Sequence, residues 1–179
     1  MPRSKSTKRR NDERGSFSRR ILGVDPGFER IGIAVIAASG KETLLYSDCF
    51  RTSPKDPFSL RLLSIGREVG RVMERYKPDA LAIETLLFNT NQKTVMRVSE
   101  ARGVIIYEAS SRGISIFEYT PLQVKIAVTG YGHATKEQIT AMVPKLIALK
   151  GNKKRLDDEY DAIAIGITHA ATCRGSTLQ

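Results

Sequence analysis

Two short apolar runs, each ending in an acidic residue, most constrain the fold. Residues 21–25 read Ile-Leu-Gly-Val-Asp and residues 80–84 read Ala-Leu-Ala-Ile-Glu. A run that is apolar on both faces predicts a strand inside a sheet that is covered by helices. A carboxylate at the edge of such a core is unfavourable unless a cation or hydrogen bonds compensate it. We therefore expect two buried strands whose ends, Asp25 and Glu84, belong to a functional site.

The rest of the hydrophobic pattern predicts a single α/β domain. An early meander of three strands is followed by helices that alternate with strands, which gives a mixed sheet with helices on both faces. The further predicted strands are 31–38, 43–51 and 114–119, and the predicted helices are 58–76, 92–111, 121–128, one from Thr135 with a capping box and a kink at Pro144, and 157–171.

Charge is spread unevenly along the chain of 179 residues, which has a net charge of +10. The first 20 residues hold eight Lys/Arg and two acids. We expect a disordered basic tail over 1–19, a folded domain over 20–173 and a flexible C-terminus over 174–179. A basic surface attracts phosphate backbones. No run approaches the roughly 20 apolar residues of a membrane span, so we expect no membrane partner. Cys49 and Cys173 lie far apart and form no disulfide framework, so we expect a cytoplasmic protein.

Four carboxylates are candidates for a shared metal site. Asp25 and Glu84 end predicted strands, where sites in α/β sheets gather. Asp158 and Asp161 are three residues apart at the start of a predicted helix, so they share one face. Four such groups repel one another unless cations are present, and all-oxygen ligation favours Mg²⁺ or Mn²⁺. Two divalent ions suit phosphoryl transfer, so an acidic pocket in a basic protein favours a metal-dependent nuclease.

Simpler interpretations of these acids stay open. Each one alone is consistent with a turn or cap residue, and Asp157 and Asp158 suit a helix N-terminus. A non-catalytic DNA-binding protein would explain the charge but would leave the four acids without a role. An actin-like sugar kinase would need a second lobe and a phosphate loop richer in Gly, Ser and Thr than Phe28-Glu29-Arg30.

Several separate motifs resemble those of the RuvC family of bacterial Holliday-junction resolvases. They follow one another in order between about Ile21 and Ala171. The stretches are Ile-Leu-Gly-Val-Asp-Pro-Gly (21–27), Ala-Ile-Glu (82–84), Ser-Glu-Ala-Arg-Gly-Val (99–104), Phe-Glu-Tyr-Thr-Pro-Leu-Gln-Val-Lys (117–125), Val-Thr-Gly-Tyr-Gly (128–132), Lys-Glu-Gln (136–138) and Asp-Glu-Tyr-Asp-Ala-Ile-Ala-Ile-Gly-Ile-Thr-His (158–169).

This resemblance implies a ribonuclease-H-like fold and a crossover junction endodeoxyribonuclease. Its catalytic residues would be Asp25, Glu84 and Asp158, and Asp161 would join them as a metal ligand. Two Mg²⁺ ions would bind per site, with Mn²⁺ as a substitute. The family acts as a homodimer on four-way junction DNA, whose two-fold symmetry it shares, and makes symmetric paired nicks in strands of like polarity. The implied setting is homologous recombination and DNA repair, with RuvA and RuvB as partners.

The resemblance also implies three DNA-binding residues. Lys125 and Lys136 match basic positions of the family, and a phosphate contact would explain a lysine in the first turn of a helix. Phe88 suits the base-stacking aromatic of the family, although Leu87 is the alternative for that position. Residues 25–35 also resemble YqgF-type nucleases that act in ribosomal RNA processing, but the paired acids near 158 favour RuvC.

Overall fold

The computed structural model of the chain describes residues 19–39, 41–86, 92–149 and 154–175. The elements are β1 (Arg19–Asp25), β2 (Arg30–Ala38), β3 (Thr43–Arg51), α1 (Phe58–Tyr76), β4 (Ala80–Glu84), α2 (Gln92–Ser111), β5 (Ser115–Tyr119), α3 (Pro121–Thr129), α4 (Lys136–Leu146) and α5 (Asp157–Gly175). This order is the one that the hydrophobic pattern predicts. Nearly all of the expected tail, Phe88 and residues 176–179 lie outside the described residues.

The five strands form one mixed sheet in the order β3-β2-β1-β4-β5. Strands β1, β2 and β3 pair antiparallel as the predicted meander. Strands β1, β4 and β5 run parallel, because α1 carries the chain from β3 back to β4 and α2 carries it from β4 back to β5. The register pairs Val24 with Ile83, so Asp25 and Glu84 follow at the same edge of the sheet.

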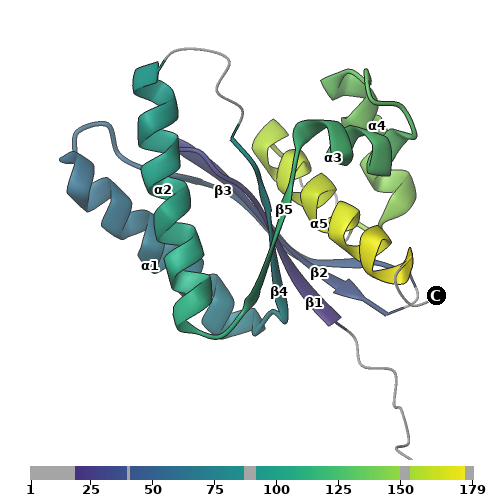
Figure 1. The fold of residues 1–179 in the computed structure, drawn as a ribbon, viewed down its shortest axis with the longest axis horizontal. Coiled ribbons are helices and arrows are strands. Elements are labelled where there is room, and N and C mark those ends of the chain that lie inside the picture. The colour runs from purple at the N-terminus through teal and green to yellow at the C-terminus, as the bar shows by residue number, and fades with distance from the viewer. Residues whose placement is uncertain (1–18, 40, 87–91, 150–153, 176–179) are drawn as a thin grey trace, which may run out of the picture.

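Helices cover both faces of the sheet, as Figure 1 shows, with α1 and α2 on one side and α3, α4 and α5 on the other. Successive residues of a strand point to opposite faces. Leu22 accordingly packs in the core beneath α1 and α2, whereas Ile21 packs in the core beneath α5. This double burial is the physical reason that both acid-terminated runs are apolar throughout.

Helix α5 lies closer to the sheet than a side chain at position 23 or 32 would permit, and both positions are glycine. A Cβ atom at Gly23 would lie 2.2 Å from the carbonyl oxygen of Ala162. A Cβ atom at Gly32 would lie 1.9 Å from the carbonyl oxygen of Asp158. Because Gly32 pairs with Asp25 across β1 and β2, the first turn of α5 is held directly over the strand end that carries Asp25.

The last matched motif, residues 158–169, ends at His169, and the role of this residue is structural. His169 is buried in α5 and its Nδ1 lies 2.8 Å from the Tyr119 hydroxyl oxygen of β5. Burial lowers the pKa of His169, which favours the neutral ring. This hydrogen bond joins α5 to the edge of the sheet.

The observed boundaries differ slightly from the expected ones. Strand β1 begins at Arg19, and α5 continues to Gly175, beyond the predicted end of the folded domain. The predicted capping box of Thr135 and Gln138 is confirmed at α4, and Pro144 lies inside that helix. Among the helices of the described residues, none combines the length and apolar character needed to cross a bilayer.

Candidate active site

The four predicted acids meet at the edge of the sheet where β1 and β4 end. Burial, which is the largest cause, and the neighbouring charges of Glu84, Asp161 and Asp158 together raise the pKa of Asp25 to about 7, against the opposing effect of Lys136. Such mutual influence requires the carboxylates to be close, because Coulomb interactions fall with distance. The predicted convergence of three distant segments is therefore visible in the electrostatics of one side chain.

Glu84 belongs to the same group. Burial and then the charge of Asp161 raise the pKa of Glu84 to about 7, and Lys136 lowers it. Burial also raises the pKa of Asp161, although its hydrogen bond with Lys136 works in the other direction. Carboxyl groups that resist ionisation in this way favour a bound cation.

Two cations of the chain already contact the acids of α5. The Lys136 Nζ lies 2.9 Å from Asp161 Oδ2 and 4.0 Å from Asp157 Oδ2. The Arg30 Nη1 lies 3.4 Å from Asp158 Oδ2. These ion pairs were not foreseen from the sequence, and that of Lys136 offsets the unfavourable position of a lysine in the first turn of α4.

The donor atoms suit a hard divalent ion. All four side chains offer carboxylate oxygens, which Mg²⁺ and Mn²⁺ prefer. In the part of the chain that the structure describes, no three His, Cys, Asp or Glu side chains are grouped so as to hold a metal ion as they stand. Lys136 and Arg30 instead neutralise two of the acids, so a metal would take the place of these cations.

Arg102 of α2 fixes the end of β4. Its Nε donates a hydrogen bond to the carbonyl oxygen of Glu84 at 3.1 Å, and its guanidinium also pairs with Glu118 of β5. Because this arginine spans two neighbouring strand ends, it holds the backbone from which the Glu84 side chain projects. Residue 102 belongs to one of the matched motifs, but sequence reasoning gave it no role.

Among the described residues, no ion pair joins Lys125 to the acids. Lys125 lies half-buried in α3, and no ion pair holds its ammonium group among the residues described here. Phe88 lies outside the described residues, so its expected role stays a prediction. Cys49 of β3 was not a candidate, yet its Sγ lies 3.6 Å from Asp158 Oδ2, and burial raises the pKa of this thiol.

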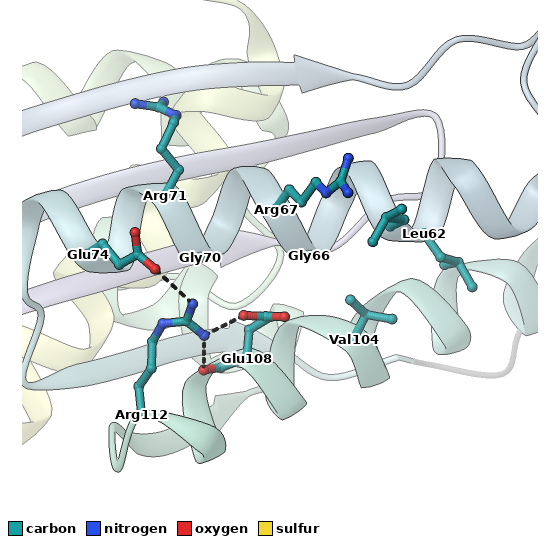
Figure 2. A pocket seen from close by; sticks show the side chains of 10 residues that line it. Leu62, Gly66, Arg67, Gly70, Arg71, Glu74, Val104, Glu108 and Arg112 are labelled. Atoms are coloured by element: carbon teal, nitrogen blue, oxygen red, sulfur yellow. Dashed lines mark hydrogen bonds and ion pairs between the residues drawn. The ribbon is translucent and has the colours of Figure 1, made fainter.

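A second pocket lies between α1 and α2, away from the acids (Figure 2). Arg112, in the turn directly after α2, projects into it and pairs with Glu74 of α1, at 3.2 Å, and with Glu108 of α2. Gly66 and Gly70 give the side chains of α2 room to approach α1. Both carboxylates already have a cationic partner, so this pocket is a poorer candidate for metal chemistry than the sheet edge.

A mixed five-stranded sheet with carboxylates at the ends of two adjacent parallel strands defines a ribonuclease-H-like protein. The profile of the family described as "Crossover junction endodeoxyribonuclease RuvC" matches residues 21–169. The chain therefore belongs to the RuvC family. This match decides between the two ribonuclease-H-like branches considered from the sequence.

Individual relatives agree with the family match. The crossover junction endodeoxyribonuclease RuvC of Moorella thermoacetica is 42% identical over 152 residues, which cover 84% of this chain and 90% of that protein. The protein of the same name from Desulforamulus reducens is 44% identical, with coverage of 84% and 92%. The structure of T. thermophilus RuvC in complex with Holliday junction substrate superposes with a TM-score of 0.83 at 35% identity, covering 89% of this chain and 97% of that one.

Proposed function

We propose that this protein is a metal-dependent endonuclease that resolves Holliday junctions by symmetric paired nicks in strands of like polarity, in homologous recombination and DNA repair. The observation that carries this proposal is the meeting of Asp25, Glu84, Asp158 and Asp161 at one sheet edge, where the pKa values of Asp25 and Glu84 are about 7. Support also comes from the relatives named for this activity and from the relative solved with a junction.

The four acids would hold two Mg²⁺ ions, or Mn²⁺ in their place. When bound, such ions supply Lewis acidity that activates a water for attack on phosphorus and stabilises the leaving oxygen. Asp25 and Glu84 have fixed positions at strand ends, and the Arg102 contact holds the backbone of Glu84. Asp158 and Asp161 come from a helix turn that Gly32 allows to sit against the sheet.

Cleavage of a synthetic four-way junction in a titration with Mg²⁺ tests the proposed activity. We expect cleavage that depends on metal and yields two symmetric nicks. A protein that binds the junction tightly at every Mg²⁺ concentration without cutting it would instead be a non-catalytic DNA-binding protein, which is the second candidate.

Lys136 and Lys125 are proposed to contact DNA phosphates. Metal at Asp161 would release the Lys136 ammonium from its present partner. Replacing Lys136 with Ala should weaken junction binding in Mg²⁺ and reduce the slope of log affinity against log salt by about 1, because one fewer phosphate is neutralised. Filter binding over a series of salt concentrations measures this slope.

Lys145→Ala serves as the control, because Lys145 is an exposed lysine in the last turn of the same helix. An unchanged slope in Lys136→Ala, or an equal change in both variants, would remove Lys136 from the phosphate contacts.

A homodimer would place two such sites on a junction that has two-fold symmetry. The outer helices α1 and α2 expose four large apolar side chains, namely Leu60, Leu63, Met96 and Tyr107. We expect Leu63→Glu to turn the dimer into a monomer, because a buried unpaired carboxylate is unfavourable in an interface. Sedimentation velocity reports the mass. Leu122→Glu, on α3, should leave the dimer intact, and a dimeric Leu63→Glu variant would contradict this interface.

We also propose that the protein acts in the cytoplasm, on chromosomal DNA. RuvA and RuvB, which move the branch point of a junction, would be its partners there. Phe88 is proposed to stack on a junction base, to which such contacts contribute about 1–3 kcal/mol per base.

A further inference from the structure

A pocket of about 440 Å³ opens beside Asp158, where the turn between β1 and β2 faces the first turns of α2. Its size is within the range of about 300–1,000 Å³ that small ligand groups occupy in proteins. It is lined by Gly27, Phe28, Glu29, Arg30, Thr94, Arg97, Val98 and Asp158.

The wall formed by the turn is rigid. The Thr52 hydroxyl donates a hydrogen bond to the carbonyl oxygen of Phe28 at 2.9 Å, and the Thr52 backbone N–H donates to the carbonyl oxygen of Glu29 at 3.0 Å. A Cβ atom at Gly27 would lie 1.9 Å from the carbonyl oxygen of Arg30. Arg30 therefore projects from a backbone that is fixed before any ligand binds, which lowers the entropy lost on binding.

Positive charge gathers around the ring of Phe28. The guanidinium carbon of Arg61 lies 3.7 Å from the ring centre, and that of Arg97 lies 5.5 Å away. Arg61 is buried, donates to the Thr52 hydroxyl at 2.9 Å, and has an Nη2 without a hydrogen-bond partner in the described structure. Among the described residues, no carboxylate forms an ion pair with Arg61 or Arg97. These guanidinium groups, together with that of Arg30, are complementary to an anion, and the carboxylates of Glu29 and Asp158 in the pocket lining offset part of their charge.

The ion pair between Arg30 and Asp158 is weak enough to be exchanged. Its distance of 3.4 Å exceeds the 2.7–2.9 Å of a strong charge-assisted hydrogen bond. The Arg30 side chain is 54% exposed, so water screens the attraction. A phosphate, which guanidinium groups bind through two parallel hydrogen bonds, would be a better partner for Arg30.

We propose that this pocket binds a backbone phosphate next to the scissile one, with Arg30 and Arg97 as its ligands, and that Arg30 leaves Asp158 to do so. The inference rests on the proposed nuclease function and adds a positioning residue to it. DNA would then free Asp158 for metal, and metal at Asp158 would free Arg30 for DNA. Coupling of this kind is reciprocal by thermodynamic necessity.

The phosphate contact is tested by combining Arg30→Gln with junctions that carry one uncharged methylphosphonate at a time, on either side of the cleavage position. With the Glu84→Gln change in every protein to prevent cleavage, we expect Arg30→Gln to weaken junction binding in Mg²⁺ by about three- to tenfold. One methylphosphonate should weaken binding by the protein that keeps Arg30 to a similar extent. The same methylphosphonate should have little further effect on the Arg30→Gln protein, because the guanidinium that would contact this phosphate is already gone.

Arg75→Gln is the matched control, because Arg75 is an exposed arginine in the last turn of α1 and does not line this pocket. This substitution should leave every one of these affinities unchanged. If every methylphosphonate weakened binding by the same factor with and without Arg30, the two effects would be independent, and the proposal would be overturned. Failure of the wild-type protein to cleave a normal junction would contradict the proposed function, and the same binding cycle would still decide the role of Arg30.

The exchange of partners is tested by Mn²⁺ binding, followed by electron paramagnetic resonance. In the free protein, Arg30→Gln should tighten Mn²⁺ binding by about two- to fourfold, because Asp158 no longer has a competing partner. The increase in Mn²⁺ affinity that a junction produces should be smaller in this variant than in the wild type. Equal Mn²⁺ affinities and equal increases in both proteins would show that Arg30 does not change partner.

Discussion

Replacing Glu84 with Gln should abolish Mg²⁺-dependent junction cleavage while junction binding is retained. The substitution keeps the shape of the side chain and removes one negative oxygen from the cluster at the sheet edge. A metal ion that is bound and oriented less well activates water and stabilises the leaving oxygen less effectively. We therefore expect a loss on the order of 1,000-fold or more in the rate of cleavage. Affinity for DNA should stay equal or rise, because one charge that repels phosphate is gone.

Single-turnover cleavage and an electrophoretic binding assay on the same junction separate these two effects. Asp158→Ala should give the same result, because Asp158 is proposed as a ligand of the same site. Glu74→Gln is the matched control, since Glu74 is an exposed glutamate of α1 whose partner is Arg112. Wild-type turnover in Glu84→Gln or in Asp158→Ala would show that the acid assignment is wrong.

Metal-free protein should become less stable as the pH rises from about 4 to 7. The pKa of Asp25 rises from its ordinary 3.8 to about 7, mainly through burial, and that of Glu84 rises from 4.5 to about 7. The folded state therefore holds protons that the unfolded chain has lost, and the free energy of unfolding falls through this range. The stabilising contribution is complete below pH 4 and is lost above about pH 7.

Asp25→Asn removes most of this dependence. At pH 8 in EDTA the variant should be more stable than the wild type by on the order of 2 kcal/mol, which raises the melting temperature by roughly 4–8 °C for a chain of this size. At pH 4 the two proteins should melt together, and excess Mg²⁺ should stabilise only the wild type appreciably. Calorimetry at the two pH values tests this expectation, and a variant that melts below the wild type at pH 8 would contradict the unfavourable ionisation of Asp25.

Local sequence pattern was sufficient to predict the sheet and its two acidic strand ends. The residues of a strand that is buried on both faces are apolar, so the acid that ends each of the runs 21–25 and 80–84 is easily recognised. The three-residue spacing of Asp158 and Asp161 likewise needs only the period of a helix. These signals lie within single segments, which is why they can be read without knowledge of the tertiary structure.

Contacts between distant segments could not be predicted in the same way. The pair of Arg30 and Asp158 joins a turn to a helix that is far along the chain, and the pair of Lys136 and Asp161 joins two helices. The first pair depends on how closely α5 lies on the sheet, which the sequence signals through Gly23 and Gly32 of the strands and Gly166 of α5. A glycine inside a strand has several possible causes, and close backbone approach is only one of them.

Gly23 and Gly32 have no side chain that would keep α5 away from the sheet, so these two positions help to build the proposed site. A methyl group at Gly32 would push against the carbonyl oxygen of Asp158 and lift the first helical turn, carrying its acids away from β1 and β4. Sensitivity of the nuclease to substitution thus reaches two positions that have no functional group at all. Redesign of metal spacing in this scaffold would begin at these bare backbone atoms, before any change to the ligands themselves.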